Sequence, residues 1–234
     1  MLFRQLFDSQ TSSYTYLLGD VKGGVALLID PVREQLERDL ALLGELGLRL
    51  THVFETHVHA DHVTSAGVLR ERTGCRLVVG EGGAPGADLH VRHGDIVRVG
   101  HLEVEVLATP GHTDDSVSYR CADRVFTGDA LLVRTCGRTD FQNGSAAQLY
   151  DSITRVLFSL PDDVSVFPGH DYKGHTQSSI GEEKRFNARV AGRDVEAFVA
   201  LMNGLHLPRP RNIDEAVPAN RACGLVPPLP PPMG

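Results

Sequence analysis

Apolar positions recur along the chain with two different periods. Alternating or short continuous apolar runs of strand length occur at residues 13–20, 24–30, 49–57, 75–80, 95–100, 101–112, 116–121, 123–132 and 164–170. Apolar positions three or four residues apart predict helices at residues 32–48, 60–74, 144–160 and 194–205. In the third of these helices, the predicted buried side is formed by Leu149, Ile153, Val156 and Leu160.

The order of these elements indicates the fold class. Strands, a helix and further strands come first, and the same pattern then follows again, without an internal sequence repeat. This order predicts an α/β protein in which two mixed β-sheets pack together with helices outside. We expect one domain over residues 1–225. Residues 226–234 are so rich in proline that we expect an extended C-terminal tail there.

Composition and charge narrow the possible partners. The chain has 234 residues, of which 41% are hydrophobic and 23% charged, and a net charge of −7 with scattered basic residues. No cationic stripe is available for nucleic acid or an anionic membrane surface, so a small molecule is the expected partner. No apolar run is long enough for a membrane span, and the first residues resemble no targeting signal. A cytoplasmic protein with four reduced cysteines is expected.

The segment THVHADH concentrates three histidines and an aspartate directly after a predicted strand. These residues are His57, His59, Asp61 and His62. They are expected in a strand-to-helix loop, with the helix beginning at Ala60. A chain seldom gathers so much imidazole and carboxylate without a metal ion, because burying many polar groups without partners is costly.

Three more residues of the same kind follow predicted strands: His112 in TPGHT, Asp129 in TGDALL and His170 in FPGHD. The ends of such strands can meet at one sheet edge, so all seven residues are expected to form one metal site. The remaining histidines show no such grouping and are expected on the surface or in ordinary hydrogen bonds; they are His52, His90, His93, His101, His175 and His206.

Together these motifs resemble the metallo-β-lactamase superfamily over residues 2–172. The resemblance implies an αββα sandwich with its metal site at one sheet edge. The superfamily includes dinuclear zinc hydrolases such as glyoxalase II, and all seven ligand positions of those hydrolases have a counterpart here. Spacing alone therefore favours two metal ions.

Three further features resemble the persulfide dioxygenase (sulfur dioxygenase) branch instead. Residues 128–153, GDALLVRTCGRTDFQNGSAAQLYDSI, are similar to that branch, as are FPGHDYKGHTQSSIGEEKRFNAR and IDEAVPANRACG. The chain also ends 64 residues after His170, which is short for the glutathione-binding extension of glyoxalase II. We therefore expect a dioxygenase of sulfide oxidation and sulfur metabolism.

This resemblance implies one non-haem Fe(II) per chain, held by His57, His112 and Asp129. Two imidazoles and one carboxylate on one face leave positions for substrate and oxygen, and iron(II), unlike zinc, can supply electrons to O₂. The other four residues of the cluster would then form an outer shell that orients the ligands; they are His59, Asp61, His62 and His170.

The resemblance further implies glutathione persulfide and O₂ as substrates, sulfite and glutathione as products, and a homodimer. Arg138 and Tyr172 resemble residues that contact glutathione, Arg138 by binding a carboxylate with two hydrogen bonds. Two alternatives remain: a dinuclear zinc thioester hydrolase of glyoxalase II type, and a metal-binding or redox-sensing module without turnover. Cys136 lies beside Arg138, but we expect it to be a packing residue rather than a nucleophile.

Overall fold

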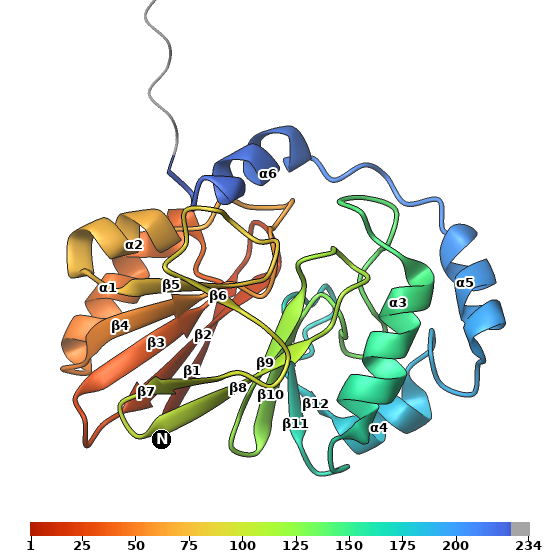
Figure 1. The fold of residues 1–234 in the computed structure, drawn as a ribbon, viewed down its shortest axis with the longest axis horizontal. Helices are drawn as coiled ribbons and strands as arrows, with labels where there is room; N and C mark the ends of the chain where they lie inside the picture. Colours follow the sequence, from red (N-terminus) through yellow and green to blue (C-terminus); the bar gives the residue numbers. More distant parts are fainter. Residues whose placement is uncertain (226–234) are drawn as a thin grey trace, which may run out of the picture.

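The first sheet of the computed structural model has six strands in the order β1-β2-β3-β4-β5-β6 (Figure 1). The strands are β1 (Leu2–Asp8), β2 (Ser13–Asp20), β3 (Val25–Ile29), β4 (Arg49–Phe54), β5 (Arg76–Gly80) and β6 (Leu89–Val91). Strands β1 to β3 pair antiparallel, whereas β3 to β6 pair parallel. The structure describes residues 1–225, and the predicted proline-rich tail at 226–234 lies outside them.

The second sheet also has six strands, in the order β12-β11-β10-β9-β8-β7. Its strands are β7 (Ile96–Val99), β8 (Leu102–Ala108), β9 (Val117–Cys121), β10 (Arg124–Gly128), β11 (Ser165–Pro168) and β12 (Ser178–Ser179). Only the β10–β11 pair is parallel; the other four pairs are antiparallel. Both sheets are therefore mixed, as predicted.

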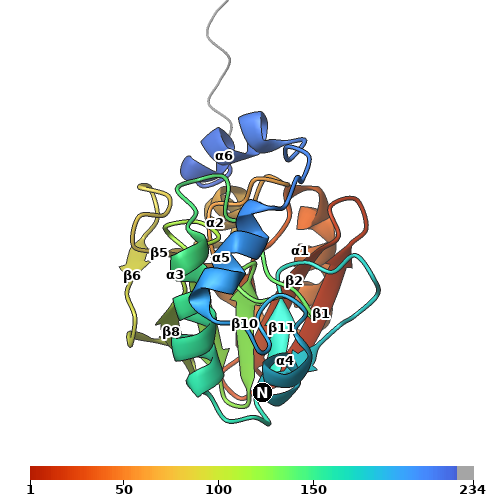
Figure 2. The same cartoon turned by 90° about the vertical axis from the view of Figure 1, so that its right-hand side faces the viewer.

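Helices cover the outer face of each sheet. They are α1 (Leu36–Glu45), α2 (Ala66–Thr73), α3 (Ala146–Asp151), α4 (Ile180–Phe186), α5 (Val195–Asn203) and α6 (Ile213–Arg221). Helices α1 and α2 lie against the first sheet, and α3, α4 and α5 lie beside the second (Figures 1 and 2). Helix α6 crosses the loops at one edge of the sandwich, as both views show.

The alternation of side chains within β3 explains why the sheets stack as a sandwich. Val25, Leu27 and Ile29 face the second sheet in the central core, whereas Ala26 and Leu28 face the helices. Successive side chains of a strand point to opposite faces, so a strand covered on both sides reads as one continuous apolar run. The predicted αββα sandwich of two mixed sheets is confirmed. Within residues 1–225, no helix has the length and apolar character to cross a membrane.

The prediction that a helix begins at Ala60 is wrong, because α2 begins at Ala66. The intervening backbone makes hydrogen bonds outside its own segment: Arg33 donates to the carbonyl of Val63, and Ser65 donates to the carbonyl of Pro31, both at 2.9 Å. These contacts replace the bonds between residues four apart that a helix requires. The loop that carries the histidine cluster is consequently longer than expected.

The helix predicted over residues 144–160 is present in a modified form. After α3, residues Ser152–Val156 form a π-helical turn, and Leu157–Ser159 form a 3₁₀ turn. A π turn adds a residue to the usual spacing and rotates the following positions. Leu157 is therefore fully buried where the sequence pattern had placed Val156, which is only partly buried.

Two helices, α4 and α6, and three strands, β1, β6 and β12, were not predicted. For α4 the sequence does contain a start signal, because the Ser179 hydroxyl accepts a hydrogen bond from the Glu182 amide at 3.2 Å. A serine followed three residues later by glutamate is typical of a helix N-terminus. Helix α6 contains Pro218, which disfavours a helix interior and hid this element from pattern analysis.

Candidate metal centre

The four loops that carry the predicted cluster converge at one edge of the sandwich. They follow β4, β8, β10 and β11. One possible ligand atom each from His57, His112 and Asp129 lies within 4.8 Å of the other two. We call these three residues the donor triad. The remaining four, His59, Asp61, His62 and His170, also lie at this edge, and we call them the paired group because their side chains make close contacts with carboxylates or, for Asp61, with histidines.

The His57 ring is held by a hydrogen bond between its Nδ1 and the Thr56 hydroxyl. The Thr56 hydroxyl donates a hydrogen bond to Asp30 Oδ2 at 2.8 Å and lies 3.0 Å from His57 Nδ1. Since the hydroxyl proton is used by Asp30, His57 Nδ1 must donate to the hydroxyl oxygen, and Nε2 keeps its lone pair. Burial and the neighbouring His59 hold the pKa of His57 well below its usual value, so the ring is neutral.

His112 is fixed in the same tautomer by backbone. Its Nδ1 donates to the carbonyl oxygen of Arg138 at 2.7 Å, which leaves Nε2 with a lone pair at 3.7 Å from Asp129 Oδ2. This approach requires glycine at position 137, because a Cβ there would lie 2.8 Å from His112 Nδ1 and 2.3 Å from the Asp129 carbonyl oxygen. Backbone packing thus determines which nitrogen of His112 is available to a metal.

Asp129 offers one oxygen to the triad and uses the other for His170. His170 Nδ1 donates to Asp129 Oδ1 at 2.7 Å, and His170 Nε2 donates to Asp61 Oδ2 at 2.9 Å. Burial opposes ionisation of Asp129, but the charge and hydrogen bond of His170 outweigh it and hold the pKa below its usual range. Burial likewise opposes protonation of His170, yet Asp129 and Asp61 raise its pKa well above the usual value. The two aspartates therefore share an imidazolium between them.

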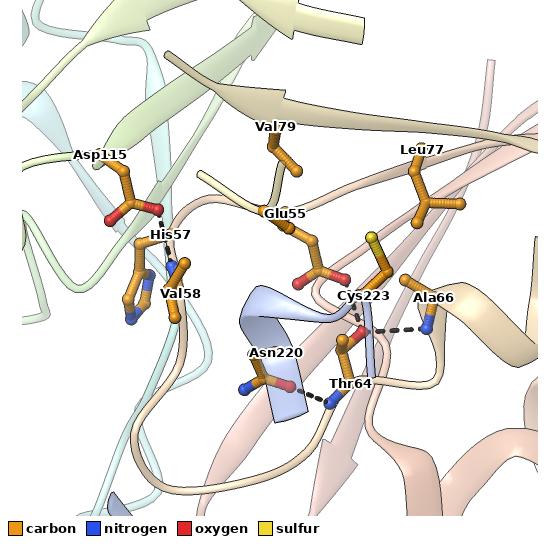
Figure 3. A pocket seen from close by; sticks show the side chains of 11 residues that line it. Glu55, His57, Val58, Thr64, Ala66, Leu77, Val79, Asp115, Asn220 and Cys223 are labelled. Carbon is orange, nitrogen blue, oxygen red and sulfur yellow. Dashed lines mark hydrogen bonds between the residues drawn. The ribbon is translucent and has the colours of Figure 1, made fainter. Parts of the chain in front are cut away.

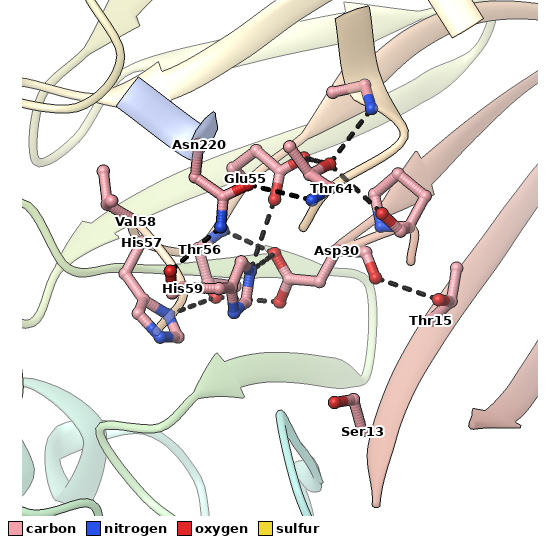
Figure 4. A network of polar contacts seen from close by, with 12 residues as sticks. Ser13, Thr15, Asp30, Glu55, Thr56, His57, Val58, His59, Thr64 and Asn220 are labelled. Atoms are coloured by element: carbon pink, nitrogen blue, oxygen red, sulfur yellow. Dashed lines mark hydrogen bonds and ion pairs between the residues drawn. The ribbon is translucent and has the colours of Figure 1, made fainter. Parts of the chain in front are cut away.

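His59 points away from the donor triad. Its Nε2 lies 3.2 Å from Asp30 Oδ1 and 3.3 Å from Glu55 Oε2, and all three side chains are buried (Figure 4). Burial lowers the pKa of His59, but the two carboxylates together outweigh burial, so that the pKa lies well above its usual value. His59 thus lies within ion-pair distance of two buried carboxylates, although neither of its ring nitrogens has a hydrogen-bond partner among residues 1–225.

His62 completes the paired group. Its Nδ1 contacts Asp61 Oδ2 at 2.7 Å, while its buried Nε2 has no hydrogen-bond partner among residues 1–225. The Ser13 hydroxyl lies 3.1 Å from both Asp61 Oδ2 and His170 Nε2. Sequence analysis missed Ser13 and Asp30, because each lies in another strand or at its end and belongs to no recognisable local motif.

A cavity of about 470 Å³ opens onto the donor triad. It is lined by the triad, Asp61 and His170, by Arg138, Phe141, Gln142 and Tyr172, and by residues 10–12, 60 and 208–212. Such a volume accommodates a small organic molecule. A second cavity, behind the loop and beside β5, has only about 10 Å³ and space for about one water molecule (Figure 3). Of these two cavities, only the larger has room for a substrate.

Arg138 and Tyr172 both line this cavity, as their predicted roles require. The Arg138 guanidinium is already paired: Nε and Nη2 donate to Asp140 at 2.6 and 2.7 Å, and Nη1 donates to the Pro208 carbonyl at 2.7 Å. Tyr172 is 72% exposed, and its ring lies parallel to that of His170 at 6.0 Å between centroids. Tyr172 is therefore at the mouth of the cavity rather than packed beneath the site.

Cys136, by contrast, is a packing residue, as expected. It is buried, and burial raises the pKa of its thiol to about 11 despite the nearby Arg189. A thiol with so high a pKa is protonated at neutral pH and is a poor nucleophile.

A fold with paired sheets, outer helices and this histidine cluster at one edge defines a class of metalloproteins. The family model described as the metallo-beta-lactamase superfamily matches residues 9–86 and 81–170. The protein is 47% identical to the mitochondrial persulfide dioxygenase ETHE1 of Homo sapiens over 228 residues, which cover 96% of this chain and 89% of the human protein. The chain thus belongs to the metallo-beta-lactamase superfamily and, within it, to the persulfide dioxygenase family.

A solved structure and a more distant relative agree with this placement. The crystal structure of ETHE1 from Myxococcus xanthus superposes with a TM-score of 0.96 at 66% identity, and the match covers 96% of this chain and all of that one. The hydroxyacylglutathione hydrolase of Rhodospirillum rubrum is 38% identical over 175 residues, covering 73% of this chain and 65% of the hydrolase. Similarity to the hydrolase is therefore lower and extends over less of the chain.

Proposed function

We propose that this protein is a persulfide dioxygenase that oxidises glutathione persulfide with O₂ and water to sulfite and releases glutathione. Membership of the persulfide dioxygenase family supports this reaction and confirms the prediction of an enzyme. One Fe(II) per chain, bound by the donor triad, is the proposed cofactor. A cytoplasmic location and a homodimer stay predictions.

The donor triad fits Fe(II) by its chemistry. Two imidazoles, each with Nδ1 fixed by a hydrogen bond, and one carboxylate oxygen make a two-histidine, one-carboxylate set. When bound, Fe(II) would supply electrons to O₂ and leave coordination positions for the persulfide sulfur. The residues around it would orient the triad: Thr56 holds His57, the Arg138 carbonyl holds His112, and His170 holds Asp129.

The main support for a single metal site comes from the two hydrogen bonds between His170 and carboxylates. Both of its ring nitrogens are hydrogen-bonded to carboxylates, so neither has a lone pair for a metal. His59, which a second-metal arrangement would also use, faces Asp30 and Glu55. Among residues 1–225 neither ring nitrogen of His59 has a hydrogen-bond partner, and one possible ligand atom each from His59, Asp61 and His62 lies within 4.8 Å of the other two. The outer-shell role proposed for the paired group is therefore supported by His170.

The larger cavity supports a substrate of the size of a small peptide thiol. We propose that Tyr172 at its mouth and Arg138 in its wall contact the glutathione part of the substrate. Because Asp140 already accepts two hydrogen bonds from Arg138, a substrate carboxylate would have to compete with Asp140 for this guanidinium. Asp140 would then lower the affinity for substrate.

Metal analysis combined with oxygen uptake tests the proposed function. Protein purified without added metal should contain about one iron per chain and consume O₂ with glutathione persulfide, producing sulfite. Two zinc ions per chain with no oxygen consumption would contradict the proposal.

The second candidate is a dinuclear zinc hydrolase of glyoxalase II type. The complete set of seven residues and the similarity to the hydroxyacylglutathione hydrolase of Rhodospirillum rubrum favour it. This candidate is tested by measuring hydrolysis of S-lactoylglutathione by the zinc-loaded protein. A zinc-loaded protein that does not hydrolyse this thioester would exclude the hydrolase function.

A further inference from the structure

The loop that carries His57 and most of the paired group has no regular secondary structure. It covers residues 55–65, between β4 and α2. His59, His62 and Thr64 are each at most 4% exposed, so their backbone groups cannot rely on water. Buried backbone N–H and C=O groups almost always have partners, so something outside the loop must hold it.

Asn220 of α6 supplies three of these partners. Its Nδ2 donates to the carbonyl oxygens of His59 and His62 at 2.9 and 2.8 Å, and its Oδ1 accepts from the amide of Thr64 at 2.9 Å. Figures 3 and 4 show the side chain reaching from α6 into the turn of the loop. An asparagine amide has two donor hydrogens and an acceptor oxygen, so this buried side chain uses its full donor capacity on the loop.

Helix α6 is itself fixed against the same part of the fold. Asn212 donates to the carbonyl oxygen of Asp61 at 2.6 Å, and the amide of Gly67 donates to the carbonyl of Cys223 at 2.8 Å. Position 67 requires glycine, because a Cβ there would lie 2.5 Å from that carbonyl oxygen. The helix and the loop are therefore joined at both ends of α6, and Asn220 lies between these two contacts in sequence.

The residues that Asn220 holds lead directly to the donor triad. The carbonyls of His59 and His62 lie on either side of Asp61 in sequence, so Asn220 fixes the backbone that places the Asp61 carboxylate. Asp61 accepts from His170, and His170 donates to Asp129. A displacement of the loop would change the orientation of Asp129 through these two hydrogen bonds.

We propose that Asn220 is a positioning residue of the metal centre, which acts through Asp61 and His170 on the orientation of the Asp129 carboxylate. This inference rests on the proposed function in taking Asp129 as a metal ligand. Asn220 does not line the larger cavity, so its effect is on the metal centre and not on substrate binding.

The test compares Asn220→Ala with Ala216→Gly. The second variant weakens the same helix but keeps the Asn220 side chain that bonds the three loop groups. The Fe(II) dissociation constant, measured by competition with a chelator, should rise about tenfold or more in Asn220→Ala, as is typical when an outer-shell partner is lost. It should stay within about twofold in Ala216→Gly. In metal-free protein, hydrogen exchange of residues 59–67 should accelerate in Asn220→Ala alone.

Asn220→Asp provides a second variant, because it keeps the acceptor for Thr64 and loses both donors to the carbonyls. It should also weaken Fe(II) binding, and in iron-saturated protein it should lower kcat while KM for glutathione persulfide is unchanged. Metal affinity and loop exchange equal to those of Ala216→Gly would overturn the inference. If wild-type protein binds one metal but consumes no O₂, the proposed function fails, while the shift in metal affinity still decides the role of Asn220.

Discussion

The donor triad and the paired group contain the same residue types but have different partners. In the triad, each histidine donates through Nδ1 to a neutral oxygen, from Thr56 or from the Arg138 backbone. In the paired group, His59 and His170 face two carboxylates each and are protonated. The neighbouring histidines of one motif thus differ in charge according to whether the nearest oxygen carries a charge, and this difference underlies their proposed roles.

The largest expected effect comes from removing the anionic member of the triad. Asp129→Ala should lose bound iron and reduce activity by more than the roughly 10–100-fold that outer-shell changes cause, because it removes the only charged ligand. Iron per chain and oxygen uptake measure this. Asp140→Asn, which alters the exposed carboxylate paired with Arg138, is the matched control for iron content. Unchanged iron content in Asp129→Ala would contradict the assignment.

His170→Ala sharpens the comparison, since it removes the imidazolium between the two aspartates. Fe(II) affinity should fall by about 10–100-fold while one iron still binds at saturation, as for the loss of an outer-shell partner. Chelator competition and metal analysis of the variant provide the measurement. Complete loss of metal binding, equal to that of Asp129→Ala, would make His170 a ligand and remove the distinction between the two groups.

Thr56→Val tests the other side of the comparison. The valine keeps the shape of threonine but cannot accept from His57 Nδ1, so the ring loses the contact that fixes its tautomer. We expect about tenfold weaker Fe(II) binding. Thr56→Ser retains the hydroxyl and should bind Fe(II) like the wild type; equal weakening in both variants would show that the hydroxyl is not the cause.

The smallest effects concern the cavity wall. Arg138→Ala should raise KM for glutathione persulfide about five- to tenfold and leave kcat nearly unchanged, because it removes substrate binding rather than metal chemistry. Asp140→Asn should lower KM by about threefold, since a neutral side chain competes less for the guanidinium. Steady-state oxygen uptake measures both. A change in kcat alone would assign Arg138 another role.

Sequence reasoning succeeded where the signal is local. Each of His57, His112, Asp129 and His170 lies within four residues after the end of a short apolar strand. Because strand ends of a layered fold meet at one edge, their convergence was predictable. The start of α2 was placed too early, because the contacts that keep Ala60 to Ser65 out of a helix come from distant parts of the chain.

The sequence also could not predict which way each imidazole ring points. His59 turns away from the triad because of Asp30, which lies 29 residues earlier at the end of β3, and Glu55. Asn220, which holds the same loop, is 161 residues from His59 and lies in a helix that was not predicted. Family resemblance placed His59 outside the predicted triad, but only the fold reveals its carboxylate partners.

Gly137 has a consequence for how this protein can vary. It contacts neither metal nor substrate in the proposed scheme, yet any side chain there would collide with the His112 ring and the Asp129 backbone together. In a library containing every single replacement, position 137 should be as intolerant as the triad itself. A map of permitted replacements would therefore trace the packing that supports the centre, and not merely the atoms that perform its chemistry.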